Sequence, residues 1–401
     1  MKKKELIFLV SFSALDAYLN FQKNFINLAC QNFKEIYFMN SDHLKILPEK
    51  FSVKKKISKK VYSGFPKKIK FFNPKTFKEL DSFLKNKNPL VINNVGRTFE
   101  TYGILFYFKK YNVSQILLGH IGNLQATIYE WHKYNLNIIK YFFTKLVSRW
   151  LTRFLIFFGI FKQIDIRFIS NSKIYKGFNK QKESILFKIF PPYYKELILV
   201  KSKIFDEFKK ERKNLKEKYI VLLDQDPEYR EIRVVGDLDK KLIKQHYLKL
   251  NVLLNQLKKI FNKKVIVSIH PLYNQKKTEK RFKNFEVIKF RTNQLLKDSF
   301  LVLSYDSSAI LQAIKLKKKI ITIQSKLFYG GKRYNSDLYA DRVGLKRINI
   351  FKNYNLNKKK LSLELTKNLK NYDKYLNKYS SGNLEELGSN KIIRVIKERY
   401  F

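Results

Sequence analysis

The chain has 401 residues, more than one hydrophobic core usually organises, so two domains are expected. Its 83 Lys and Arg residues against 33 Asp and Glu give a net charge of +50, which attracts polyanions, phosphorylated substrates and acidic lipid surfaces. Lys, Asn, Ile, Phe and Tyr are abundant together, as AT-rich coding produces, so charge alone selects no partner. Cys30 is the only cysteine, which excludes an internal disulfide framework and fits a reducing cytoplasm.

The first residues, MKKKELIFLVSFSAL, allow two interpretations. Three lysines before an apolar run of about ten residues are typical of a signal peptide, and the same run is typical of a buried strand. We favour the strand, because the rest of the chain reads as cytosolic.

Short apolar runs and helical patterns alternate through the N-terminal part, which predicts a βαβ domain over residues 1–170. Strands are expected within Glu35–Asn40, Pro89–Gly96 and Ser114–Asn123, with helices over Phe77–Asn86 and Tyr102–Tyr111.

Residues 138–166 interrupt this alternation. Lys145, Arg149 and Arg153 recur every four residues and form a basic stripe on a helix. The remaining faces are apolar and largely aromatic: Phe142, Phe143, Leu146, Trp150, Leu151, Phe154, Phe157 and Phe158. The longest uncharged piece is far shorter than the roughly 20 residues that cross a bilayer. An in-plane membrane helix and a helix packed in the protein's own core both fit this pattern.

The second half repeats the α/β alternation. Residues 171–215 are polar and lysine-rich and are expected to connect the domains. Strands and helices then alternate over residues 216–352, with a long amphipathic helix over Leu238–Phe261, and a lysine-rich helical segment covers residues 353–401.

Three strand-following loops of the second domain are expected to meet, because parallel strands deliver their loops to one sheet edge. They are Asp224–Asp226, His270–Asn274 and Ser304–Ser308. The serines of the third loop suit a plain helix cap or a phosphate site. His270 suits a phosphate contact or a turn before Pro271.

The spacing of these elements resembles that of GT-B glycosyltransferases, in particular bacterial surface-polysaccharide enzymes of the sialyltransferase, polysialyltransferase and CDP-glycerol glycerophosphotransferase types. The resemblance is carried by LLDQD (Leu222–Asp226), SIHP (Ser268–Pro271), SYDSSAILQAI (Ser304–Ile314) and KKKIITIQ (Lys317–Gln324). It implies two Rossmann-like domains with a cleft between them.

The resemblance also implies roles for individual residues. His270 would contact the donor phosphate, and Ser307 and Ser308 would bind phosphate or nucleotide hydroxyls. Gln312 stands where many relatives carry a ribose-binding glutamate. The full set of implied donor-site residues is His270, Pro271, Asp306, Ser307, Ser308, Gln312, Lys332 and Arg333, with Asp224, Gln225 and Asp226 at the cleft edge.

Sugar transfer with inversion needs a base for the acceptor hydroxyl. Asp16 and His120, which follow N-terminal strands, are the catalytic candidates, ahead of Glu100. Asp224 and Asp226 would suit a metal, but the resemblance implies catalysis without metal or other cofactor. The co-substrate is expected to be a nucleotide-activated sugar, CMP- or CDP-linked in preference to UDP-linked.

The leading hypothesis is therefore an inverting transferase that extends a surface glycan or lipid-linked acceptor, cytoplasmic and peripheral on the inner membrane face. A UDP-sugar 2-epimerase is a second hypothesis, although epimerases carry Asp-Ser-Gly-Gly where this chain has Asp306–Ala309. A non-enzymatic polyanion-binding protein is the third. No recognisable nucleic-acid-binding module is found, so no nucleic acid is expected as a partner.

Overall fold

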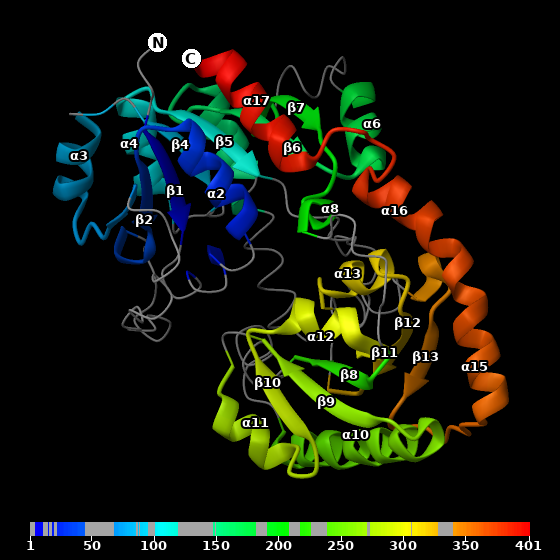
Figure 1. Cartoon of the computed structure of the whole chain (residues 1–401). Helices are drawn as coiled ribbons and strands as arrows, with labels where there is room; N and C mark the ends of the chain where they lie inside the picture. The colour runs from blue at the N-terminus through cyan, green and yellow to red at the C-terminus, as the bar shows by residue number, and fades with distance from the viewer. Residues whose placement is uncertain are drawn as a thin grey trace. The chain divides into compact units, whose positions relative to one another are not determined.

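The structure, a computed structural model, divides into two compact units (Figure 1). The first comprises Met1–Gly122, Phe143–Glu207 and Tyr379–Phe401, and the described residues of the second lie within Phe208–Lys378. The structure describes residues 5–10, 15, 18–19, 22–44, 68–85, 87, 89–94, 101–118, 147–148, 150–181, 191–207, 217–225, 239–270, 273–305, 307–327 and 340–401.

The first unit contains a parallel seven-stranded sheet with the order β3-β2-β1-β4-β5-β6-β7. The central strand β1 has the sequence LIFLV, and all five side chains are buried, as expected where helices cover both faces. The strand interpretation of the first apolar run is thus confirmed. The strands are β1 (Leu6–Val10), β2 (Ile36–Asn40), β3 (Ile69–Phe72), β4 (Leu90–Asn93), β5 (Ser114–Leu118), β6 (Ile164–Ile169) and β7 (Tyr194–Leu199).

Helices cover both faces of this sheet because successive side chains of each strand point to opposite sides. Leu6 and Phe8 pack with α2 and α17, whereas Ile7 and Leu9 pack with α3 and α4. The helices of this unit are α2 (Lys23–Asn32), η2 (Asp42–Leu44), α3 (Phe77–Lys85), α4 (Tyr102–Lys110), α6 (Ser172–Gln181), α8 (Ile204–Glu207) and α17 (Gly388–Tyr400).

The second unit contains a parallel six-stranded sheet with the order β10-β9-β8-β11-β12-β13. Numbered along the chain, this is the 3-2-1-4-5-6 order of doubly wound nucleotide-binding domains. The strands are β8 (Tyr219–Asp224), β9 (Lys264–Ile269), β10 (Glu286–Lys289), β11 (Ser299–Ser304), β12 (Lys319–Gln324) and β13 (Lys346–Asn349).

The long helix α10 (Lys240–Phe261) packs on one face of this sheet. Asp239 caps its first turn by accepting a hydrogen bond from the Lys241 amide at 2.8 Å, and Asn262 ends it in a left-handed conformation. The remaining helices are α11 (Gln275–Arg281), α12 (Thr292–Asp298), α13 (Ile310–Lys315), α15 (Lys358–Lys367), η7 (Asn368–Asn371) and α16 (Tyr372–Ser380), which runs across the division between the units.

The unit boundaries differ from those expected from the sequence. The stretch 171–215 contains α6 and the edge strand β7, so much of it belongs to the first sheet rather than to a connection. The chain end also returns to the first unit, where Ile392 and Ile396 of α17 pack with α2. Polar, lysine-rich composition hid both features, because an edge strand and a surface helix each expose half of their side chains.

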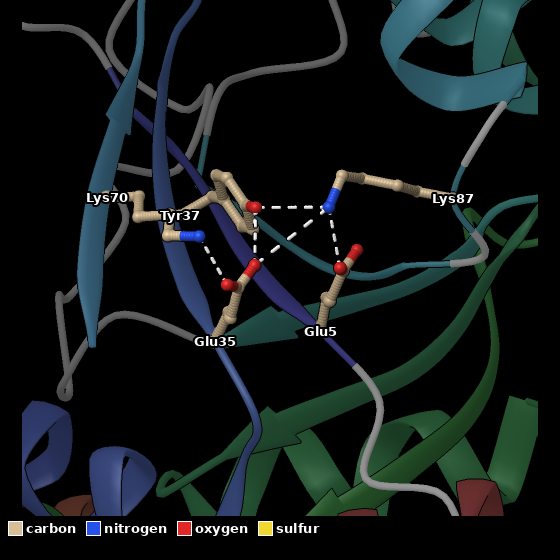
Figure 2. Close-up of polar contacts among 5 residues, drawn as sticks. All are labelled: Glu5, Glu35, Tyr37, Lys70 and Lys87. Carbon is tan, nitrogen blue, oxygen red and sulfur yellow. Dashed lines mark hydrogen bonds and ion pairs between the residues drawn. The ribbon is translucent and has the colours of Figure 1, made fainter.

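A network of charged side chains lies at the amino edge of the first sheet (Figure 2). The Lys87 ammonium donates to Glu5 Oε1 at 2.6 Å and to the Tyr37 hydroxyl at 3.0 Å. Glu35 accepts hydrogen bonds from Lys70 and from Tyr37, and these bonds lower the pKa of its carboxyl. Because ligands of such sheets bind at the opposite, carboxyl edge, we assign this network to strand pairing rather than to a site.

Gly388 allows α17 to begin against the first sheet. Its amide and that of Ser389 donate to the Asp206 carboxylate at 3.2 and 2.8 Å, and a Cβ at Gly388 would collide with the Lys201 carbonyl. The first turn of α17 is therefore fixed by a close backbone approach that only glycine permits.

We predict that Gly388→Ala lowers the free energy of unfolding by about 1–3 kcal/mol, because backbone atoms must move to admit the methyl group. Urea denaturation followed by circular dichroism measures the change. Gly177→Ala in α6 is the matched control, since a Cβ there meets no atom within 4 Å and alanine favours the helix. Equal changes in the free energy of unfolding for the two substitutions would contradict the close backbone approach at Gly388.

Candidate functional site

The strand order of the second sheet reverses between β8 and β11, and ligands of doubly wound domains bind beside the carboxyl ends at such a point. In the parallel register Asp224 pairs with Ile269 and Leu223 with Ser304. The residues that follow these pairs, Gln225 and His270 among them, therefore emerge along one edge. Asp224 and Gln225 are buried there, at 3% and 5% exposure.

His270 begins a turn that is fixed from two sides. Its carbonyl accepts a hydrogen bond from the Tyr273 amide at 2.9 Å, and the His270 and Tyr273 rings lie 5.0 Å apart. The Lys289 ammonium, at the end of β10, donates to the Tyr273 carbonyl at 2.9 Å. His270 is partly exposed and lies at the carboxyl end of β9, the position that the sequence predicted.

Phe290 is a further candidate residue that the sequence analysis did not name. It directly follows β10, its φ is +66°, and 53% of its surface is exposed. A bulky residue in the left-handed region is rare, and such strain gathers at functional sites. The Lys289 ammonium lies 5.1 Å from the ring centroid. An exposed aromatic ring beside a cation suits stacking of a nucleobase.

The turn that carries Phe290 is held in place by its neighbours. The Ser268 hydroxyl on β9 lies 2.9 Å from the Thr292 hydroxyl at the start of α12. Continuing the register of Lys289 with Ile269 places Phe290 beside His270. An aromatic residue ending an apolar run, FEVIKF, is the signal in the sequence that would have indicated this position.

Ser307 and Ser308 follow β11 on the other side of β8. Ser307 Oγ accepts a hydrogen bond from the Ala309 amide at 3.3 Å, so it caps a turn before α13. Because α13 has six residues, its dipole contributes little, and a phosphate would depend on the hydroxyls themselves. Gln312 is 5% exposed, and within the described part of the chain its Oε1 accepts no hydrogen bond.

A buried polar chain supports the carboxyl end of β11. His246 of α10 is fully buried, with Nδ1 2.8 Å from Ser325 Oγ and Nε2 3.2 Å from the Tyr305 hydroxyl. Burial, with a smaller contribution from Arg281, lowers the pKa of His246 to about 3. Burial, followed by the Asp224 charge, raises the pKa of Tyr305. The imidazole is therefore neutral at physiological pH and joins α10 to β11 and β12.

Several predicted site residues lie outside the described part of the chain: Asp16, Glu100, His120, Asp226, Pro271, Asp306, Lys332 and Arg333. Their roles stay predictions. Among the described residues, no group of three or more His, Cys, Asp or Glu side chains is arranged to hold a metal ion.

No protein-family model matches the chain, and no curated protein matches it by sequence. Solved structures match it over nearly its whole length. A UDP-N-acetylglucosamine 2-epimerase is 12% identical, with 100% of this chain and 98% of that chain covered and a TM-score of 0.52. The wall teichoic acid polymerase TagF is 12% identical, with 99% of this chain and 88% of that chain covered and a TM-score of 0.51. MnaA of S. aureus in complex with UDP is 13% identical, with 98% of this chain and 96% of that chain covered and a TM-score of 0.50.

These similarities establish the fold. Two α/β units with parallel sheets, together with neighbours of the GT-B fold, confirm the predicted fold class.

Replacing His246 by Gln, which forms hydrogen bonds but does not titrate, tests the buried hydrogen-bonded chain of His246, Tyr305 and Ser325. In the wild type the lowered pKa adds stability that is fully present above pH 6.5, the ordinary His value, and is lost as the pH falls toward about 3. We predict that the free energy of unfolding of His246→Gln falls less steeply than that of the wild type between pH 6.5 and about 3, measured by urea denaturation. His43→Gln, at an exposed histidine, is the control and should keep the wild-type slope. An unchanged slope in His246→Gln would contradict the buried, neutral imidazole.

Proposed function

We propose that the protein is a GT-B glycosyltransferase that moves a sugar or polyol phosphate from a nucleotide-activated donor to a surface glycan or lipid-linked acceptor. The observation that carries the proposal is the convergence of Phe290, His270, Gln225 and Ser307 on one sheet edge through the parallel register. The similarity to a wall teichoic acid polymerase and to a UDP complex supports it at the level of the fold.

The donor would lie across the carboxyl ends of four adjacent strands. From β10 to β11 there are three strand spacings, about 14 Å in all, a length that a nucleoside diphosphate can span. The base would stack on Phe290, and His270 would donate a hydrogen bond to a phosphate oxygen. Ser307 and Ser308 would hold the distal phosphate. Lys332 and Arg333 would add charge.

Transfer requires the acceptor oxygen to form a bond to the donor carbon or phosphorus while the bond to the departing phosphate breaks. Negative charge then develops on the leaving group, and His270 with the serine hydroxyls would stabilise it. A base must accept the acceptor's proton, and Asp16 and His120 remain our candidates. We propose that the reaction needs no metal and that the donor is CMP- or CDP-linked. We place it at the inner face of the cytoplasmic membrane, where a lipid-linked acceptor would be found.

A 2-epimerase is the second candidate, because 2-epimerases share the fold over the whole chain. Against it stands the sequence, in which Ser308 and Ala309 replace the two glycines of the epimerase pattern. Incubation with UDP-N-acetylglucosamine alone separates the two, since an epimerase changes this sugar without an acceptor and a transferase does not.

We predict that Phe290→Ala and His270→Ala each weaken binding of CMP, CDP and UDP about fivefold or more. The double variant Ser307→Ala with Ser308→Ala should weaken binding of CDP and UDP to the same extent, because these nucleotides carry the distal phosphate. Loss of base stacking costs ~1–3 kcal/mol, as does loss of a hydrogen bond to a charged group, and 1.4 kcal/mol is tenfold. Isothermal titration calorimetry measures the affinities.

The controls are Leu248→Ala on α10, an apolar side chain exposed to 58%, and His43→Ala in the other unit. Both should bind nucleotide as the wild type does. Wild-type affinity in all three site variants would reject the site, and salt-dependent binding of random oligonucleotides without nucleotide preference would favour polyanion binding instead.

A further inference from the structure

The helix around residues 150–157 turns most of its aromatic side chains outward. Two of its buried positions are polar, since Ser148 and Thr152 are 1% and 0% exposed, and Ile156 is a buried apolar one. Six of the thirteen exposed large hydrophobic residues in the described part of the chain gather here, at 40–57% exposure: Val147, Trp150, Phe154, Phe157, Phe158 and Ile160.

We call these six residues the aromatic patch. Trp150, Phe154, Phe157 and Phe158 follow at helical spacing and share one face, with the rings of Phe154 and Phe158 4.4 Å apart. Packing of this segment in the protein's own core was one of the two interpretations of the sequence, but these four side chains are exposed.

The opposite face fixes the helix to the first unit. The Tyr102 hydroxyl of α4 donates to the Ser148 carbonyl at 3.0 Å and lies 2.9 Å from Thr152 Oγ1. One turn further, Ile156 packs with Leu105 and Phe161. The orientation of the helix is thus set by specific contacts, and the outward position of the patch follows from them.

A cation flanks the patch. The Arg153 guanidinium lies 5.7 Å from the Trp150 ring and 5.4 Å from the Tyr193 ring. In the sequence Lys145 and Arg149 precede it at intervals of four, and the whole chain carries +50. Such a charge opposes docking of a second copy and favours an anionic surface.

Every helix within the described part of the chain is too short or too polar to span a bilayer. Aromatic rings with a flanking arginine on an outward helix face are suited to lie in the plane of a lipid interface, with rings at the acyl boundary and cations on head groups.

We propose that the aromatic patch is a lipid-contact surface that inserts into the interface of an anionic bilayer. This inference goes beyond the proposed transfer reaction and stands whether or not the chain binds a nucleotide. It identifies the face of the first unit that would be held against the membrane.

The test is flotation of the full chain with vesicles made of equal parts phosphatidylglycerol and phosphatidylcholine. Phe154→Ser with Phe158→Ser should lower the vesicle partition coefficient about tenfold, because two rings that would be buried in the bilayer are lost. The matched control, Leu248→Ser with Val252→Ser, changes two apolar side chains of similar exposure, also four residues apart, on α10. It should partition as the wild type does.

Phe157→Ser provides a second, milder variant, and melting temperatures establish that all variants fold. Equal partition of the patch variants and the control would overturn the proposal, as would equal wild-type partition into vesicles of phosphatidylcholine alone. A dimeric wild type and a monomeric patch variant, measured by analytical ultracentrifugation, would also contradict the lipid-contact proposal. Nucleotide affinity of the patch variants should equal the wild-type value, so failure here is distinguishable from failure of the donor site.

Discussion

The parallel pairing of β8 with β9 on one side and β11 on the other is the constraint on which the candidate site depends. Five buried apolar residues of β8, YIVLL followed by Asp224, hold this strand between its neighbours. Side chains on both faces of β8 are buried, so a slip of one residue would disrupt close packing on both faces, and this packing fixes the register. The register in turn decides that residues more than eighty positions apart, Gln225 and Ser307, leave the sheet at the same edge.

The same edge combines rigid support with strain. His246 joins Tyr305 and Ser325 through a buried hydrogen-bonded chain. Lys289 fixes the turn after β9 through Tyr273, and Ser268 fixes the turn after β10 through Thr292. Phe290 is held in a left-handed conformation by this surrounding structure. A residue whose backbone is fixed in this way loses less conformational freedom when its ring stacks on a ligand, which favours binding.

The sequence predicted the elements whose signal is local. Continuous apolar runs such as LIFLV and KVIVSI became central strands, and the period of Leu238–Phe261 became α10, because burial on both faces or one face leaves a distinct pattern. It missed β7 and the return of α17, where lysine-rich composition masks half-buried elements. His270 and Ser307 were predicted from strand ends, but Phe290 was not, since backbone strain and exposure are properties of the folded chain.

A crystal structure of the full chain with bound CDP or UDP is the most direct test of the account. We predict that the base lies on the Phe290 ring and that the phosphates extend past His270 toward Ser307, along the carboxyl edge between β10 and β11. A nucleotide bound at the amino edge of this sheet, or on the first unit alone, would contradict the account.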